Sequence, residues 1–515
     1  MGTSEEEYNA LTCVQLRAIC KERGLVQKGV KKVIVDRLMK DDEASTPAAA
    51  PTPTQAVHSS PQKEDNEEED IGIILGSPTK VLSSSSPVKT PVKSPAPAAS
   101  ASSSIDNNDQ EFQDETHTCH LFEGRSKYLS PSGLHFIANH QYRPSEYTHL
   151  DNLLNPFWTY LTECLPLWLA PNMVTTLGGM HCALAYGVMW YYCPDFDTTP
   201  PDWVVMLAGY CAFAYYTLDC MDGKQARRTG SSSPLGQLFD HGFDCICTLF
   251  FVATFSSYLE IGGTHWYNML QTSLQFAFFM AQWEEYHTLV LPHNAGKWCG
   301  VTEVNYASAL GAMCVSLIDR EAFFQKSMED TLAPLGLTGG VAKDMELRHF
   351  LLCGWGGMSL ILMGLSLQRT LCHPRIAGED MDVSEIRFNR INALSKLASP
   401  FLLCVAAFIV PPEFIRTRYL SVVLGCALSL LTKKMIVFSM AKMPYAIIQT
   451  DIIPFIFAAI WIRYDTRLTK EGGDFVLGVL SFWYAYRLLR WVNVAINQIC
   501  AKLGIYCFRL KKRDD

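Results

Sequence analysis

Residues Asp219–Asp244 read DCMDGKQARRTGSSSPLGQLFDHGFD, with four aspartates in a region otherwise rich in apolar side chains. Asp219 and Asp222 are three residues apart, and Asp240 and Asp244 are four apart, so on helices each pair points to one side. The Gly, Ser and Pro residues between the pairs allow the chain to turn and bring the pairs face to face. Four converging carboxylates repel one another unless a cation lies between them, and hard oxygen ligands favour Mg²⁺, Mn²⁺ or Ca²⁺.

The rest of the chain indicates a membrane protein, because 49% of its 515 residues are hydrophobic and only 18% are charged. Residues 1–145 are polar, whereas hydropathy predicts about ten membrane spans in the remainder, each long enough or nearly long enough to cross the hydrocarbon core. The fold class expected is therefore an all-α polytopic membrane protein. The spans are expected at 172–193, 203–219, 236–258, 266–291, 301–318, 348–369, 395–411, 418–433, 435–461 and 474–498.

The N-terminal residues 1–40 are expected to form a small separate unit of two helices, with Gly24 ending the first helix. The segment LTCVQLRAICKERGLVQKGVKKVIVDRL resembles the SAP family of helix–loop–helix modules. That family commonly binds DNA or RNA, so the resemblance makes four basic residues candidates for phosphate contacts. The alternative is a module that binds protein or has lost its ligand. The four candidates are Lys28, Lys31, Lys32 and Arg37.

Residues 41–118 are dominated by Ala, Pro, Ser and Thr around an acidic run, a composition that predicts a disordered linker. The domain plan is then a module at 1–40, a linker at 41–118 and a membrane domain at 119–515. At the entry to the membrane domain, residues 155–172 read NPFWTYLTECLPLWLAPN. This pattern predicts an amphipathic helix on the membrane interface, or else a packed helix that precedes the first span.

The aspartate stretch also predicts phosphoryl chemistry, because ionisable residues at membrane depth cost about 2.5–3.5 kcal/mol each and mark functional sites. Metal ions held by the aspartates would neutralise a pyrophosphate and stabilise a leaving phosphate. Gly223 has no Cβ and lets a phosphate or metal approach the backbone. Ala226 allows close packing of helices, while Lys224 and Arg227 offer cationic donors.

The spacing D-x2-D-G-x2-A-R-x8-G-x3-D-x3-D resembles the signature of the CDP-alcohol phosphotransferase family. The segments DGKQARRT, SSSPLG and LFDHG resemble the eukaryotic choline/ethanolamine phosphotransferases more closely. The resemblance extends over residues 120–515 through APNMVTTLG, VTEVN and INQICAKLGIYCFRLK. The residues that match the signature are Asp219, Asp222, Gly223, Ala226, Arg227, Gly236, Asp240 and Asp244.

This resemblance implies transfer of phosphocholine or phosphoethanolamine from its CDP carrier to the hydroxyl of diacylglycerol, with release of CMP. It implies a homodimer in the endoplasmic reticulum or Golgi membrane with a cytosolic site, and the C-terminal KKRDD nearly matches a dilysine retrieval signal. The four aspartates would hold two Mg²⁺ or Mn²⁺ ions. The sequence does not discriminate choline from ethanolamine, or a diacyl from an ether-lipid acceptor. The CDP pocket would be lined by Asn172, Gly223, Lys224, Ala226, Arg227 and Glu303.

A general base is required, because a diacylglycerol hydroxyl is a poor nucleophile until its proton is removed. His241 is the first candidate, since it lies between two of the aspartates and titrates near neutral pH. Relatives typically carry Glu one turn earlier, where this chain has Gln237. An amide can hydrogen-bond an imidazole but cannot stabilise its cation by charge, so Asp244 is the alternative base. His241 would then support a metal-binding carboxylate.

A second polar cluster, WEEYHT at Trp283–Thr288, lies within a predicted span. Glu284, Glu285 and His287 are candidates for head-group recognition or lipid entry, or they lie where the span reaches the membrane surface. The competing function is a transporter that uses intramembrane carboxylates for divalent cations. Residues 250–500 contain no second copy of the acidic motif, which disfavours the internal repeats common in transporters.

Overall fold

The computed structural model describes residues 114–510 except 124–127, 141–146, 197, 293–295, 299, 336–343 and 416–417. It also describes Ile19, Arg23, Val35 and Leu38, of which Val35 and Leu38 are helical and buried. The chain divides into two units, residues 1–111 and 112–515. The four phosphate-contact candidates of the N-terminal module, the linker up to residue 113 and the C-terminal KKRDD lie outside the described residues.

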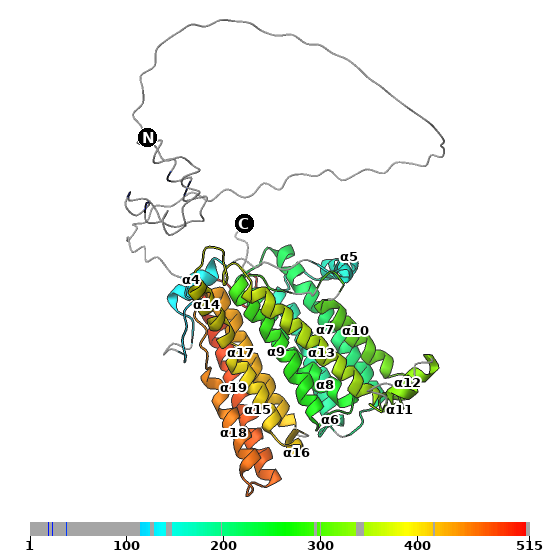
Figure 1. Ribbon diagram of the computed structural model, residues 1–515. Helices are drawn as coiled ribbons and strands as arrows, with labels where there is room; N and C mark the ends of the chain where they lie inside the picture. The colour runs from blue at the N-terminus through cyan, green and yellow to red at the C-terminus, as the bar shows by residue number, and fades with distance from the viewer. Residues whose placement is uncertain are drawn as a thin grey trace, which may run out of the picture. The chain divides into compact units, whose positions relative to one another are not determined.

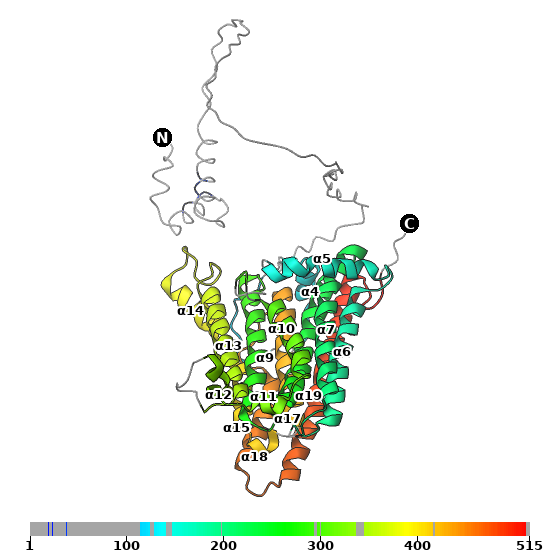
Figure 2. The same ribbon diagram turned by 90° about the vertical axis from the view of Figure 1, so that its right-hand side faces the viewer.

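The second unit is helical, and within its described residues no β-strand occurs apart from two isolated bridges. The axes of the long helices lie roughly parallel to one another in both views (Figures 1 and 2). In chain order the helices are α4 (Pro131–Ala138), α5 (His149–Cys164), α6 (Pro171–Tyr192), α7 (Asp202–Thr229), α8 (Pro234–Tyr258), α9 (His265–Thr288), α10 (Val301–Val315), α11 (Arg320–Phe324), α12 (Met328–Leu332), α13 (Leu347–Leu371), α14 (Val383–Ser395), α15 (Ala398–Ile409), α16 (Pro412–Ile415), α17 (Arg418–Ala441), α18 (Ile453–Tyr464) and α19 (Lys470–Leu503).

Five helical segments in the described part of the chain are long and apolar enough to cross a membrane. They are α7, α8, α13, the α14–α15 segment Val383–Ile409, and α17. The chain is therefore a membrane protein with a mostly helical fold, as the hydropathy pattern predicts. The larger number of about ten spans stays a prediction, because the remaining helices are too short or too polar to qualify by composition alone.

The expected break between spans 418–433 and 435–461 is wrong. One helix, α17, continues through Lys433 and Lys434 to Ala441, and the next α-helix begins only at Ile453, after the 3-10 helix Thr450–Ile452. Two adjacent lysines lower the hydropathy of this segment, yet both side chains are buried in the protein. Hydropathy placed the break there because it scores each residue alone and takes no account of the groups that surround it.

Helix α5 confirms that a helix precedes the long helices, and it lies at one end of them together with α4 (Figures 1 and 2). A capping box between Thr148 and Asp151 begins α5. Its Trp158 is buried and donates a hydrogen bond of 2.9 Å to the Tyr306 hydroxyl of α10, whereas Tyr160 is 66% exposed. One face of α5 therefore packs on the protein while the other presents apolar surface, and its position at a membrane interface stays a prediction.

Candidate active site

The two aspartate pairs lie on consecutive helices that are joined by a short turn. Helix α7 ends at Thr229, and Gly230 adopts a φ of 65°, in the left-handed region that glycine accepts without strain. Ser233 then caps α8, because its hydroxyl accepts a hydrogen bond from the backbone N–H of Gly236. The turn predicted between the pairs is therefore present, and it returns α8 alongside α7.

Three of the four aspartates converge in the structure. Asp219, Asp222 and Asp240 each offer a carboxylate oxygen within 4.8 Å of the other two. The buried Oδ1 atom of Asp219 has no hydrogen-bond partner, while the Thr175 hydroxyl of α6 donates to Asp222. Three carboxylates this close repel one another in the absence of a positive charge, and their oxygens suit a hard divalent cation. The residues present therefore fit a metal ion.

Asp244 lies one helical turn beyond Asp240 and is not part of that group of three. Its Oδ1 atom accepts a hydrogen bond from the Tyr215 hydroxyl of α7. The ammonium group of Lys433, on α17, interacts electrostatically with the same carboxylate. The fourth aspartate is thus connected to two residues that lie outside the aspartate stretch.

His241 is buried on α8, with its Nε2 atom 3.9 Å from the Asp240 carboxylate. One turn earlier, the side chain of Gln237 joins two other residues. Its carbonyl oxygen accepts a hydrogen bond of 2.9 Å from Nε2 of His140, and its amide donates one of 3.0 Å to Glu285 of α9. Burial lowers the pKa of His140 below its usual value, and the hydrogen bond with Gln237 partly offsets that effect.

The residues expected to line a CDP pocket come from three helices. Gly223 is open, because the only atom near a Cβ placed there is a nitrogen of Arg227, 3.6 Å away. Lys224 donates hydrogen bonds to the side chains of Asn155 and Thr159 on α5. The carbonyl of Ala226 accepts a hydrogen bond from the backbone N–H of Ser231 in the turn. Gly223, Lys224, Ala226 and the exposed Arg227 thus occupy the last two turns of α7.

Asn172 and Glu303 lie on neighbouring helices. Asn172, in the first turn of α6, donates a hydrogen bond of 2.9 Å to the Cys507 carbonyl near the C-terminus. Glu303, in the first turn of α10, has a buried Oε2 atom without a hydrogen-bond partner. Helix α10 packs on α7, where the Tyr306 hydroxyl lies 3.0 Å from that of Thr217.

The part of the chain that holds this site matches a known family. The model of the CDP-alcohol phosphatidyltransferase family matches residues 168–329, which include all four aspartates. The chain carries a CDP-alcohol phosphatidyltransferase domain. A second family model, that of the SAP domain, matches residues 7–43, so the chain also has a SAP domain at its N-terminus.

Relatives extend the likeness beyond the transferase domain. Choline/ethanolaminephosphotransferase 2 of Arabidopsis thaliana is 28% identical over 410 residues, which cover 75% of this chain and 99% of the relative. Ethanolaminephosphotransferase 1 of Mus musculus is 39% identical over 177 residues, or 32% of this chain and 44% of the relative. Cholinephosphotransferase 1 of Bos taurus is 39% identical over 181 residues, or 35% of this chain and 44% of the relative.

The second polar cluster is buried beside the transferase domain's motif. Glu284 accepts two hydrogen bonds from the Arg369 guanidinium of α13, at 2.6 and 2.8 Å. Glu285 accepts the hydrogen bond from Gln237 described above. His287 is 2% exposed, and its backbone carbonyl accepts a hydrogen bond from Arg375. Glu284 is therefore buried and forms an ion pair with Arg369. The expected role of the cluster in head-group recognition or lipid entry stays a prediction.

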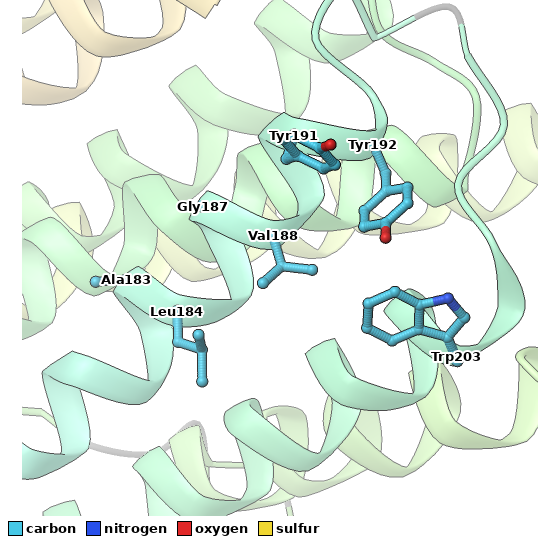
Figure 3. A pocket seen from close by; sticks show the side chains of 7 residues that line it. All are labelled: Ala183, Leu184, Gly187, Val188, Tyr191, Tyr192 and Trp203. Atoms are coloured by element: carbon cyan, nitrogen blue, oxygen red, sulfur yellow. The ribbon is translucent and has the colours of Figure 1, made fainter.

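An apolar groove of about 380 Å³ lies on α6 and the start of α7 (Figure 3). It contains no carboxylate and none of the motif residues, so it is separate from the aspartate cluster. Its lining consists of Ala183, Leu184, Gly187, Val188, Tyr191, Tyr192 and Trp203.

Sequence reasoning missed four side chains that reach the motif: Thr175, Tyr215, His140 and Lys433. The first two are ordinary polar residues in apolar helices and carry no distinctive signal. His140 lies about one hundred residues before its partner Gln237, a separation that spacing rules do not bridge. Lys433 did carry a signal, because a lysine inside an apolar segment of more than 20 residues requires a reason.

Proposed function

We propose that this chain transfers phosphocholine or phosphoethanolamine from CDP-choline or CDP-ethanolamine to diacylglycerol and releases CMP. The observation that carries the proposal is the convergence of Asp219, Asp222 and Asp240 within 4.8 Å, inside the segment that matches the transferase family. The printed names of the relatives supply the substrates: a choline/ethanolamine, an ethanolamine and a choline phosphotransferase.

The proposed metal site holds two Mg²⁺ or Mn²⁺ ions on Asp219, Asp222, Asp240 and Asp244. When bound, the ions neutralise the diphosphate of the donor and stabilise the charge that develops on the departing CMP. The unpartnered Oδ1 of Asp219 supports this assignment. Thr175 and Tyr215, which hydrogen-bond Asp222 and Asp244, would orient these two carboxylates toward the site.

The proposed CDP pocket surrounds the last two turns of α7. Gly223 leaves the backbone accessible, and Lys224 and Arg227 supply positive charge for the phosphates or the cytosine. Ala226, Asn172 and Glu303 complete the expected lining. Asn172 and Lys224 already have partners in Cys507 and Asn155, so donor binding would exchange protein contacts for contacts to the nucleotide.

The proposed base is His241. Its imidazole takes the proton of the diacylglycerol hydroxyl as that oxygen bonds to the β-phosphorus of the donor, and the bond from this phosphorus to the CMP oxygen breaks. Asp244 is the alternative base. Gln237 and its partners His140 and Glu285 would fix the helical turn from which His241 projects.

The wider setting is also part of the proposal. The membrane domain would span residues 119–515, with about ten crossings formed by α6–α10, α13, α14–α15 and α17–α19. It would lie as a homodimer in the endoplasmic reticulum or Golgi membrane with its site toward the cytosol. The linker 41–118 would join it to the SAP-like module at 1–40, whose ligand is a nucleic acid or a protein.

The decisive experiment supplies the purified full-length chain with diacylglycerol and either CDP-choline or CDP-ethanolamine, and measures CMP release with Mg²⁺, with Mn²⁺ and with a chelator. Release from at least one donor, abolished by the chelator, is expected. Asp219→Asn should lower the rate by about 100-fold or more, because a metal ligand is lost. The matched control Asp465→Asn changes a partly exposed aspartate after α18 and should leave the rate unchanged. No CMP release from either donor would reject the proposed function.

A further inference from the structure

Helix α17 carries two adjacent lysines in its buried middle, and their surroundings differ. The Lys434 ammonium donates hydrogen bonds to Glu123, to Asp451 at 2.6 Å and to Gln449 at 3.2 Å. Lys433 is also buried, with 6% of the residue exposed against 1% of Lys434. Within the described part of the chain, however, its amine has no hydrogen bond and no ion pair.

The packing of α17 on α8 fixes where Lys433 lies. Gly425 of α17 meets Leu249 of α8, and the Ser429 hydroxyl donates a hydrogen bond of 2.8 Å to the Cys245 carbonyl. One turn further along α17, a Cβ placed on Gly242 would lie 3.5 Å from Cε of Lys433. The two helices thus run in opposite directions along this contact, and Lys433 lies at the level of the Asp240–Asp244 turn.

A buried ammonium requires a counter-charge, because desolvation of an unpaired charge costs several kcal/mol or more. The aspartate that interacts electrostatically with Lys433 is Asp244, but their charged atoms do not approach within 4.0 Å. Asp244 is instead hydrogen-bonded by Tyr215. The amine of Lys433 thus lies beside the aspartate motif, and Asp244, the carboxylate with which it interacts electrostatically, already accepts a hydrogen bond from Tyr215.

We propose that Lys433 binds the diphosphate of the nucleoside-diphosphate donor, as a cationic contact supplied by α17 and not by the aspartate motif. The inference rests on the proposed function, which brings a diphosphate to this motif. The diphosphate is the group of the donor whose charge matches the lysine, whereas choline and ethanolamine are cations that it would repel. Lys433 lies outside residues 168–329, so the family match does not include it.

The test measures binding of CDP-choline or CDP-ethanolamine, whichever supports CMP release, to the full-length protein with Mg²⁺ and without diacylglycerol. Titration calorimetry of Lys433→Met should give a donor Kd about 10- to 100-fold higher, since one charge-assisted contact is lost. The donor KM should rise in parallel, and the Mg²⁺ concentration for half-maximal activity should stay unchanged. Lys433→Arg, which keeps the charge, should retain most of the affinity.

The matched control is Lys434→Met, the same substitution at the adjacent buried position. It should lower the melting temperature, because Glu123 and Asp451 lose the cation that they share, while the donor Kd of the folded fraction changes by less than about threefold. If Lys433→Met does not fold, Lys433→Gln removes the charge and keeps a polar end group, and the same rise in donor Kd is expected.

Two results would overturn the inference. One is an unchanged donor Kd in the folded Met or Gln variant. The other is an altered Mg²⁺ requirement with an unchanged donor Kd, which would mean that Lys433 acts on the Asp244 carboxylate and not on the donor. Both differ from failure of the proposed function, in which the wild-type protein itself releases no CMP.

Discussion

Asp451, between α17 and α18, connects two cations on separate helices. Its carboxylate accepts hydrogen bonds of 2.6 Å from Lys434 and from the Arg487 guanidinium of α19. Burial alone would raise the pKa of Asp451, but these two positive charges lower it below the usual value overall. A carboxyl group with a lowered pKa stabilises the fold above pH 3.8, and that contribution is lost as the pH falls through the lowered pKa.

Removal of Lys434 should therefore be costly. In Lys434→Met, the carboxylates of Glu123 and Asp451 remain buried without their shared cation. We expect a loss of about 3–5 kcal/mol in the free energy of unfolding, the usual cost of breaking a buried pair from one side. Thermal unfolding in detergent measures the loss. A melting temperature within 1–2 °C of the wild type, by the same order-of-magnitude reasoning, would contradict it.

Tyr215 should contribute to turnover through Asp244. Tyr215→Phe removes the hydroxyl that donates to the carboxylate and leaves the ring in place among buried aromatic side chains. We expect kcat to fall by about 10-fold, the scale of one hydrogen bond to a charged group, with little change in melting temperature. Tyr216→Phe, at the next buried tyrosine of α7, is the control and should keep its kcat.

His140 should make stability depend on pH just below neutrality. Because its pKa is lowered from 6.5, the unfolded chain binds a proton there more readily than the folded one, so stability decreases as the pH falls below 6.5. In His140→Asn this part of the decrease disappears. If the substitution lowers the melting temperature at pH 7, the difference between variant and wild type should therefore become smaller between pH 7 and about pH 5.5. His135→Asn, an exposed histidine of α4, should follow the wild-type profile.

At the scale of elements, hydropathy located most helices but misplaced the ends that carry charge. The span expected at 203–219 is part of α7, which continues ten residues further through the motif to Thr229. Hydropathy ends the span at Asp219 because charges enter there. The helix continues because its aspartates face a shared cluster, and only Gly230, with its left-handed backbone, ends it. The same cause produced the false break in α17.

The close contact between α17 and α8 requires a glycine at position 425. A Cβ on Gly425 would lie 2.6 Å from a methyl carbon of Leu249, closer than side chains tolerate. Gly425→Ala should therefore separate the two helices and lower the free energy of unfolding by about 1–3 kcal/mol. The control is Gly357→Ala in α13, where nothing lies within 4 Å of the added carbon. There the better helix propensity of alanine should leave stability equal or slightly higher.

At the scale of the whole molecule, the site could be predicted only where it is local in sequence. Asp219, Asp222 and Asp240 were found from spacing and a turn signal, since α7 and α8 are consecutive. Tyr215 and Lys433 could not be placed at Asp244 from sequence, because helical periodicity gives the face of each helix but not the neighbour it meets. The partners of Gln237 were missed for the same reason: His140 and Glu285 come from separate elements.

The segment that leads into the membrane domain contributes to its stability. Besides the ion pair of Glu123 with Lys434, the backbone N–H of Ile447 donates a hydrogen bond of 2.9 Å to the His120 carbonyl. Deletion of residues 1–111 should leave the melting temperature and CMP release of the remaining chain near wild type. Deletion of residues 1–128 should destabilise it by several kcal/mol, because the buried pair is broken as well. Equal stability of the two truncations would refute this role.

The two lysines of α17 also constrain how this helix can change in evolution. Successive residues on a helix differ by about 100° in direction, so Lys433 is directed at α8 while Lys434 is directed at Glu123 and Asp451. Insertion or deletion of a single residue earlier in the helix would turn every later side chain by that angle and disconnect both lysines at once. Point substitutions along α17 act on one neighbour at a time. We therefore expect this helix to accumulate substitutions but not changes of length.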